Sequence, residues 1–229
     1  MNIYLVVEGE KTETLVYNKW IGYTNNSLRV VRSISDVSVN NVYMIVGNGW
    51  PCYLDRIKAA VEDVCTKTDA HGLQLFSRLV VAVDTETVTV EEKTAEITKT
   101  VTEALNGSHM AFDLHVVAQH FCIEAWFLGN KNLVLHTQLA LSKEDIKNYN
   151  VSKLDPELLC VPSNSSVGSK AQYAEKYLAR LIKDKFPKSS YSKNDPGPIL
   201  HEKYYKSIVS RFNNAGHIQS FGSFIKAFT

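Results

Sequence analysis

Short apolar runs alternate with amphipathic stretches over about the first 128 residues. The apolar runs are rich in β-branched residues and end in turn-forming residues, as is typical of buried strands. They predict strands over residues 3–7, 28–34, 41–47, 78–84 and 112–118. Apolar residues at helical spacing predict helices over residues 12–21, 52–66 and 89–105. This alternation favours an α/β fold with a largely parallel central sheet flanked by helices.

The pattern changes after residue 130. Strand signals fade, and two polar loops span residues 161–170 and 187–198. Apolar spacing predicts helices over residues 171–186, 199–212 and 220–228, the first with a core face of Leu178, Leu181 and Ile182. We therefore expect a core domain over residues 1–130 and a helical, basic extension over residues 131–229 that packs on it.

The two parts of the chain differ in charge. The 229 residues carry a formal net charge of +1, which by itself points to no class of partner. Residues 1–168 hold 14 Lys or Arg and 20 Asp or Glu, a net charge of −6, whereas residues 169–229 hold 11 and 4, a net charge of +7. This asymmetry suits a polyanion bound beside a cation site. It equally suits two halves that attract each other within the fold.

Cysteine spacing and the N-terminus bear on the compartment. The chain has no CxxC motif and no Cys/His ligand spacing among Cys52, Cys65, Cys122 and Cys160. We therefore expect reduced, buried thiols in a cytoplasmic protein. The first apolar run follows no basic segment and is too short for a signal peptide or a membrane span, so no membrane association is expected.

Carboxylates follow two of the predicted buried strands. Glu8 comes directly after the first strand, while Asp84 ends the strand over 78–84 and Glu86 follows it. Parallel α/β sheets carry their functional groups at the carboxyl ends of strands. If the two strands are neighbours, these side chains converge, and like charges so close together need a cation or shared protons. Oxygen ligands prefer Mg²⁺, Mn²⁺ or Ca²⁺, so this edge is a candidate metal site.

Two further carboxylates, Glu10 and Glu13, lie at the start of the helix that follows Glu8. Acidic residues at a helix N-terminus are stabilised by the helix dipole by about 0.3–1 kcal/mol each. That effect alone is a sufficient alternative explanation for Glu10 and Glu13. It is a weaker explanation for Glu8 and Asp84 taken together, because each of these two ends a buried strand.

The stretch QHFCIEAWFLGN, residues 119–130, places a carboxylate among apolar residues. His120 and Glu124 are four residues apart, which predicts that they share one face of a helix. An ionised Glu124 on so apolar a helix must be paired or bind a cation, so a site role and a buried salt bridge both stay open. For His120 the favoured interpretation is a hydrogen-bonded core or helix-start histidine.

These motifs resemble a known family in their order along the chain. A strand ending in Glu-Gly, followed by a later strand ending in Asp-x-Glu, resembles the Toprim domain of topoisomerases, primases and OLD-family nucleases. More narrowly, VVEGEKTE is similar to the opening of the RloB-like proteins of bacterial defence systems. CIEAWFL (122–128), YSKNDPG (191–197) and SFGSFIKAF (220–228) are similar to later segments of that group.

The resemblance implies roles for individual residues. Glu8 matches the Toprim glutamate, a metal ligand or acid/base group, and Asp84 with Glu86 matches the pair that binds the divalent ion. The pair here is Asp-Thr-Glu where Asp-x-Asp is usual, which puts the second metal in doubt. Glu13 lies five residues after Glu8, where the OLD nucleases tend to have an acid four residues on. Lys193 matches a lysine that approaches the scissile phosphate in OLD-type nucleases.

Basic residues with aromatic neighbours fill the C-terminal part. Lys176, Arg180 and Lys183 are spaced to share one face of the helix predicted over 171–186. Such a stripe is typical of phosphate contacts, and a solvated helix face is an equally good interpretation. No P-loop and no GxSxG motif is found in the sequence, so ATP binding through a P-loop is not expected.

The resemblance and the carboxylates together predict a divalent-metal-dependent endonuclease that uses Mg²⁺ or Mn²⁺ and cleaves DNA or RNA. Its expected catalytic residues are Glu8, Asp84, Glu86 and Lys193, with Glu13 and Glu124 as further metal ligands. The family implies an anti-phage effector that works with an ATPase partner protein, and a homodimer stays open. The alternative is a Toprim module without catalysis that binds nucleic acid or a partner protein.

Overall fold

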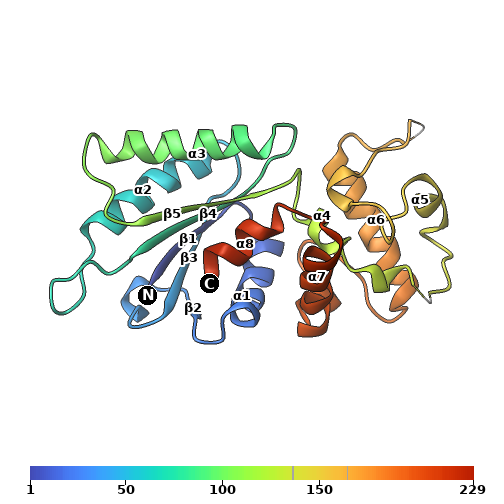
Figure 1. Ribbon diagram of the computed structural model, residues 1–229, viewed down its shortest axis with the longest axis horizontal. Helices are drawn as coiled ribbons and strands as arrows, with labels where there is room; N and C mark the ends of the chain where they lie inside the picture. Colours follow the sequence, from blue (N-terminus) through green and yellow to red (C-terminus); the bar gives the residue numbers. More distant parts are fainter. Residues whose placement is uncertain (136, 164) are drawn as a thin grey trace.

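The computed structural model describes residues 1–135, 137–163 and 165–229. At its centre is a five-stranded, all-parallel sheet with the strand order β2-β3-β1-β4-β5, shown in Figure 1. The strands are β1 (Ile3–Val7), β2 (Arg29–Val31), β3 (Asn41–Val46), β4 (Arg78–Asp84) and β5 (Asp113–Gln119). The sheet is flanked by helices, which confirms the α/β fold with a parallel central sheet that the apolar pattern predicts.

The central position of β1 explains its composition. All five of its residues are buried, because the strand is paired on both sides and covered on both faces. Val7 lies opposite Val46 of β3 and opposite Ala82 of β4 in the register. Since all strands run in the same direction, their carboxyl ends meet along one edge of the sheet, and the residues after β1, β3 and β4 meet there.

Helices cover the two faces of the sheet in pairs. One apolar cluster joins the Tyr4 and Val6 side of β1 to α2 (Cys52–Thr66) and α3 (Val90–Leu105). The other cluster joins Ile3, Leu5 and Val7 to α1 (Thr12–Thr24) and α8 (Phe221–Phe228). Figure 1 shows these pairs on opposite sides of the sheet. Successive side chains of β1 point to opposite faces of the sheet, so the strand contributes residues to both apolar clusters.

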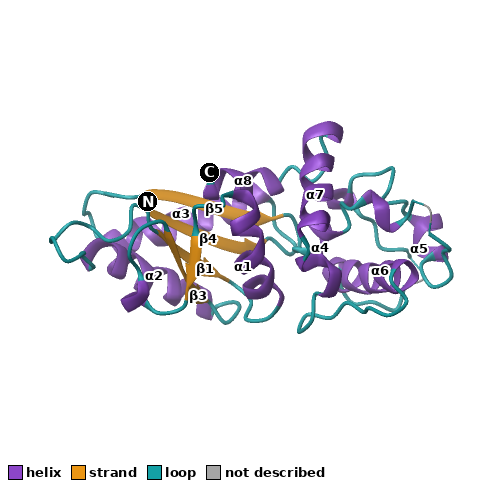
Figure 2. Cartoon of the chain, turned by 90° about the horizontal axis from the view of Figure 1, so that it is seen from below, coloured by secondary structure: helices purple, strands orange, loops and turns teal. Residues whose placement is uncertain are grey.

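The remaining helices lie beyond the carboxyl edge of the sheet, at the other end of the long axis (Figure 2). They are α4 (Glu124–Phe127), α5 (Lys143–Asn148), α6 (Lys170–Lys185) and α7 (Glu202–Ala215), with the short 3₁₀ helices η2 (Lys131–Leu133), η3 (Pro156–Leu158) and η4 (Gly197–Leu200). Another 3₁₀ helix, η1 (Ile34–Asp36), instead lies between β2 and β3, where Ile34 packs against the α2 and α3 side of the sheet. The chain then returns to the sheet, where Arg78 Nη1 donates to the Ala227 carbonyl oxygen over 2.7 Å. Leu178, Leu181 and Ile182 of α6 are buried, as their spacing predicts.

Several predicted boundaries differ from those observed. Only Arg29–Val31 of the strand expected over 28–34 is paired, and η1 follows it. The helix expected over 12–21 continues to Thr24, and the one expected from 199 begins at Glu202 because η4 occupies the preceding residues. Within the loop expected over 161–170, Asn164 lies outside the described residues.

Two predictions about individual residues are wrong. His120 and Glu124 do not share a helix face, because α4 begins at Glu124 and Phe121 takes a positive φ of 50°, which turns the chain before it. The cysteines are not uniformly buried either. Cys122 is buried, whereas the other three thiols are exposed because the side chains of Cys52, Cys65 and Cys160 lie on helix ends and a loop.

No helix among residues 1–135, 137–163 and 165–229 combines the length and the apolar character needed to cross a membrane.

Candidate functional site

A cleft of about 500 Å³ opens at the carboxyl edge of the sheet. The loops after β1, β3 and β4 line one side, and the start of α4 and the loop before η4 complete it. Its lining residues are Glu8, Gly9, Glu10, Lys11, Thr12, Glu13, Asn48, Gly49, Asp84, Glu86, Ile123, Glu124 and Lys193. All six residues predicted as metal-binding or catalytic therefore lie around one cleft. They come from segments that are far apart in the sequence.

Glu8 and Asp84 are held together by the backbone of the sheet edge. The Glu8 N–H donates to the Ala82 carbonyl oxygen over 3.0 Å, and the Asp84 N–H donates to Glu8 Oε2 over 3.1 Å. The side chain of Asp84 is not satisfied in the same way. Its Oδ1 atom is buried and has no hydrogen-bond partner among the described residues. A buried carboxylate oxygen without a donor is costly, and it is therefore a natural position for a proton or a cation.

Glu13 turns back from the first turn of α1 toward the sheet. Its Oε2 accepts a hydrogen bond from the Gly9 N–H, and its Oε1 accepts one from Gln119 Nε2 over 3.3 Å. A Cβ atom at Gly9 would collide with the Glu13 carboxylate, so glycine is needed for this close approach. The result is a glutamate whose side chain is buried beside Glu8, and not a solvated helix-start acid.

The carboxylates of the cleft raise one another's pKa values. Burial raises the pKa of Glu13 to about 8, with the charge of Glu8 as the next cause. Burial also raises the pKa of Asp84 well above its usual value, followed by the charges of Glu13, Glu124 and Glu8. For Glu8 the pKa is raised mainly by burial. The protonation of Glu13 and of Asp84 therefore depends on the charge of the neighbouring cleft acids.

Glu124 is the most deeply buried acid of the cleft, with 2% of its surface exposed. The Tyr191 hydroxyl donates to its Oε1 over 2.8 Å. No ion pair of Glu124 is found among the residues that the structure describes. Of the two interpretations left open by the sequence, the buried salt bridge therefore has no partner in this part of the chain.

Lys193 provides positive charge at the rim. Its carbonyl oxygen accepts a hydrogen bond from Thr12 Oγ1 over 3.0 Å, which ties the loop to the start of α1. Its ammonium group lies 3.9 Å from Glu175 Oε2 and is about half exposed. Burial lowers the pKa of Lys193, but the charges of Glu124, Glu175 and Asp84 outweigh it, so the pKa is raised. Lys193 is thus charged at the rim of the cleft.

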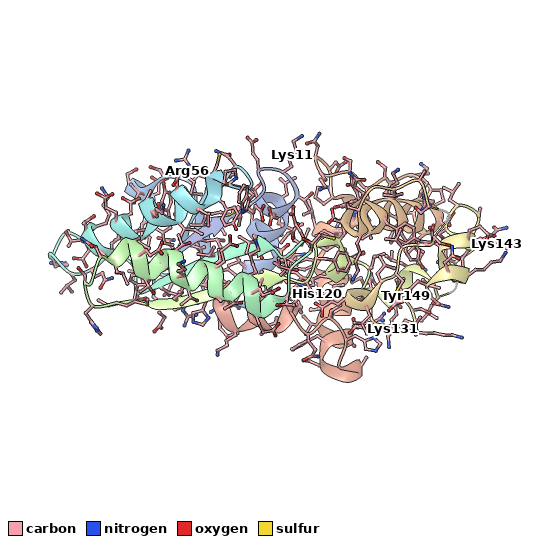
Figure 3. All side chains as sticks on the ribbon, turned by 90° about the horizontal axis from the view of Figure 1, so that it is seen from above. Lys11, Arg56, His120, Lys131, Lys143 and Tyr149 are labelled. Carbon is pink, nitrogen blue, oxygen red and sulfur yellow. The ribbon has the colours of Figure 1, made fainter. Side chains whose placement is uncertain are left out.

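The other rim residues are more exposed. Glu86 lies in the left-handed region with a φ of 53°, and its N–H donates to the Phe121 carbonyl oxygen over 3.2 Å. Lys11, labelled in Figure 3 at the same edge of the molecule as Arg56, is exposed beside the α1 N-terminus. These residues can meet a ligand that enters the cleft from solvent.

The donor set of the cleft fits a hard cation. Its ligating atoms are carboxylate oxygens, with an unpartnered oxygen on Asp84 and raised pKa values on its neighbours. Within the described residues, no three His, Cys, Asp or Glu side chains are already arranged as a metal-binding group. The side chains that would hold a cation here are Glu8, Glu13, Asp84 and Glu124, and they would have to move to surround it.

The predicted basic stripe lies on α6, and none of its residues lines the cleft. Arg180 makes a two-pronged contact with Asp145, with Nε and Nη2 each 2.6 Å from a carboxylate oxygen. Lys183 Nζ donates to the Pro187 carbonyl oxygen over 2.6 Å, and Lys176 is exposed. The guanidinium of Arg180 is thus already engaged within the protein, and a phosphate role for the stripe stays a prediction.

Sequence reasoning did not identify two residues that hold the site together. Gln119, the last residue of β5, also donates to the Tyr17 hydroxyl over 3.0 Å, and Tyr191 holds Glu124. A polar residue at the end of an apolar strand was a usable signal for Gln119. Tyr191 begins the segment YSKNDPG, in which the resemblance pointed to Lys193 and not to the tyrosine. His120 does not line the cleft; its N–H donates to Ser220 Oγ over 3.2 Å.

Comparison of the chain with protein-family models, with curated proteins and with solved structures found no match.

Proposed function

We propose that this protein is a divalent-metal-dependent nuclease that hydrolyses phosphodiester bonds of DNA or RNA at the acidic cleft. The observation that carries the proposal is the buried, unpartnered Oδ1 of Asp84, surrounded by three further carboxylates at the carboxyl edge of a parallel sheet. A cluster of like charges at such an edge is costly without a cation, and it is a common arrangement in enzymes that act on phosphates.

In this proposal Glu8, Glu13 and Asp84 hold Mg²⁺ or Mn²⁺. When bound, such an ion supplies Lewis-acid charge and a water of lowered pKa. Lys193 offsets negative charge on the phosphoryl oxygens from the opposite rim. The N-terminus of α1, whose first residues line the cleft, adds partial positive charge and free backbone N–H groups.

The wider role rests on the resemblance of the motifs. VVEGEKTE, the strand ending in Asp-Thr-Glu and the segments CIEAWFL and YSKNDPG are similar to Toprim proteins of the RloB-like and OLD-related group. All four segments contribute residues to the cleft. We accordingly propose an effector in an anti-phage defence system, with an ATPase partner protein.

One observation favours a second candidate function, a Toprim module that binds nucleic acid or a partner without catalysis. No preformed group of three ligating side chains is found among residues 1–135, 137–163 and 165–229. A binding module would need no such group. The acidic set is nevertheless complete around the cleft, which is why catalysis is the first proposal.

Metal titration and cleavage assays test the proposal together. Mn²⁺ is expected to raise the melting temperature of the wild-type protein and to support cleavage of plasmid, single-stranded DNA or tRNA. Asp84→Asn should lose both effects, whereas Glu62→Gln, which changes an exposed acid on α2 outside the cleft, should keep both. A folded protein that binds nucleic acid without any response to Mn²⁺ or Mg²⁺ would favour the binding module instead.

A further inference from the structure

Trp50 lies on a loop at the same sheet edge as the acidic cleft. Residues 47–51 join β3 to α2, and β3 is the direct neighbour of β1. The Gly47 N–H donates to the Val7 carbonyl oxygen over 2.7 Å, and the Gly49 N–H donates to that of Glu8 over 3.2 Å. Asn48 and Gly49 line the cleft. The loop that presents Trp50 is therefore bound to the residue that carries the Glu8 carboxylate.

The backbone of this loop is fixed by packing. The Tyr53 N–H donates to the Gly49 carbonyl oxygen over 3.0 Å, and the side chain of Tyr53 is buried. A Cβ atom at Gly47 would lie 2.7 Å from the Cβ of Tyr53 and 3.2 Å from the Val7 carbonyl oxygen, so only glycine fits between these groups. The position of Trp50 next to the cleft is thus set by the buried structure under it.

The indole of Trp50 is open to solvent, unlike the other tryptophans. Trp50 is 65% exposed, whereas Trp20 and Trp126 are 0% exposed. Most of the apolar surface of this ring is therefore uncovered.

We propose that Trp50 stacks on an unpaired nucleobase next to the phosphate held in the cleft, so that the substrate is single-stranded nucleic acid or an unpaired segment of a folded one. This inference rests on the proposed nuclease function and names its substrate class. Every base offers a flat face to an aromatic ring, whereas a paired base inside a duplex is covered by its neighbours. The stacking contact is independent of sequence and of the sugar, so both DNA and RNA fit.

The acidic character of the cleft supports a single strand. A duplex brings two charged backbones to the edge, and the positive groups that the cleft itself provides are few, Lys11 and Lys193. One strand, with its base on Trp50 and one phosphate at the carboxylate-bound cation, needs less positive charge. Stacking then contributes affinity that charge does not supply.

Tryptophan fluorescence tests this directly, because Trp50 is the exposed indole of the three. Oligonucleotides of about 12 nucleotides, within the usual footprint of single-strand binders, are titrated with Ca²⁺ in place of Mn²⁺ to slow cleavage. The probes are a single-stranded DNA, the same strand of RNA, the matching duplexes and an abasic strand. Quenching is expected with both intact single strands and not with the duplexes or the abasic strand.

Substitutions separate stacking from other contacts. Trp50→Ala should weaken single-strand binding by about tenfold or more, while Trp50→Phe keeps most of it. The matched control is Leu73→Ala, which removes an apolar side chain that is also 65% exposed but lies before β4, at the opposite edge of the sheet. It should bind as the wild type does.

The outcomes distinguish this inference from the proposed function. If Trp50→Ala binds single strands like the wild type, or if no nucleic acid binds, stacking is wrong. If Trp50→Ala loses single-strand binding but keeps its Mn²⁺-induced rise in melting temperature, stacking is supported and the metal site is intact. If quenching by single strands persists in a protein with no response to Mn²⁺ and no cleavage, the stacking inference holds and the nuclease proposal fails.

Discussion

The backbone N–H of Asp84 donates a hydrogen bond to Glu8 Oε2 over 3.1 Å, while Oδ1 of Asp84 is buried without a partner. The two carboxylates are thus fixed side by side by the parallel pairing of β1 with β4, although 76 positions of sequence separate them. The backbone N–H compensates Glu8 in part. Asp84 has no such compensation from the described residues, so the requirement for a cation or a proton falls mainly on this side chain.

Asp84→Asn is expected to separate stability from activity. Removing one of several repelling charges should leave the metal-free protein as stable as the wild type or more so, while Mn²⁺-dependent cleavage falls by at least about 100-fold. Glu8→Gln should have the same two effects. The double variant should reduce the cleavage rate little further than either single variant, because the effects of residues that act as a unit are not additive.

Denaturant unfolding in EDTA and cleavage assays with Mn²⁺ measure these two quantities, with Glu62→Gln as the control for loss of an acid elsewhere. A purely structural role predicts the reverse pattern, in which stability is lost and activity falls only with the folded fraction. Well-folded Asp84→Asn protein that cleaves at the wild-type rate would contradict the proposed metal site.

Glu124→Gln is expected to weaken Mn²⁺ binding by about tenfold without destabilising the metal-free protein. The amide oxygen of glutamine still accepts the hydrogen bond from the Tyr191 hydroxyl, and a buried charge is removed. Tyr191→Phe is the companion change, because it keeps the carboxylate but removes its donor. It should cost about 1–3 kcal/mol of stability.

Calorimetry with and without Mn²⁺ checks both variants. Loss of about 3–5 kcal/mol in Glu124→Gln, together with unchanged Mn²⁺ affinity, would instead indicate that Glu124 is one half of a buried ion pair.

The metal-free protein should lose stability as the pH rises. The pKa of Glu13 is raised by burial and by Glu8 to about 8 in the folded state, from 4.5 for an ordinary glutamate. A raised pKa of an acid means that the folded state binds the proton more tightly than the unfolded state. The contribution is therefore fully present below about pH 4.5 and is lost as the pH rises through about 8.

Urea unfolding in EDTA at about pH 5 and pH 8.5 measures this loss. Glu13→Gln should reduce it, and saturating Mn²⁺ should oppose it, since bound metal stabilises the deprotonated carboxylates. Stability that is independent of pH over this range in EDTA would show that the carboxylates do not repel one another in the folded protein.

Arg180 and Lys176 are expected to respond differently to truncation, although both belong to the predicted basic stripe. Arg180→Ala removes two charge-assisted contacts with Asp145, a buried acid, and should cost about 2 kcal/mol of stability. Lys176→Ala changes an exposed side chain and should stay within about 0.5 kcal/mol of the wild type. Thermal unfolding of the two variants is the measurement.

The phosphate role of the stripe is then best tested with Lys176→Ala combined with Lys183→Ala, which avoids the loss of the Arg180 contacts. A flatter dependence of nucleic-acid affinity on salt would support phosphate contacts from α6. An unchanged slope would leave this face as solvated surface.

The local pattern of the chain determined the sheet and the edge at which the site lies. Continuous β-branched apolar runs mark the buried strands because a strand covered on both faces buries every side chain, and parallel strands bring their carboxyl ends together. Glu8, Asp84 and Glu86 could therefore be placed at one edge from sequence alone. The predicted boundaries were wrong where a 3₁₀ turn replaces regular structure, as at η1 and η4.

Only the tertiary structure decided which side chains are paired and which are left unsatisfied. Glu13 is buried because Gly9 lets its carboxylate fold back, Arg180 is engaged by Asp145, and Glu124 is held by Tyr191 across 67 positions of sequence. The exposure of Trp50 beside the cleft is likewise a product of the packing around it. Such contacts join segments distant in sequence, and no local periodicity encodes them, because they depend on how separately formed elements meet.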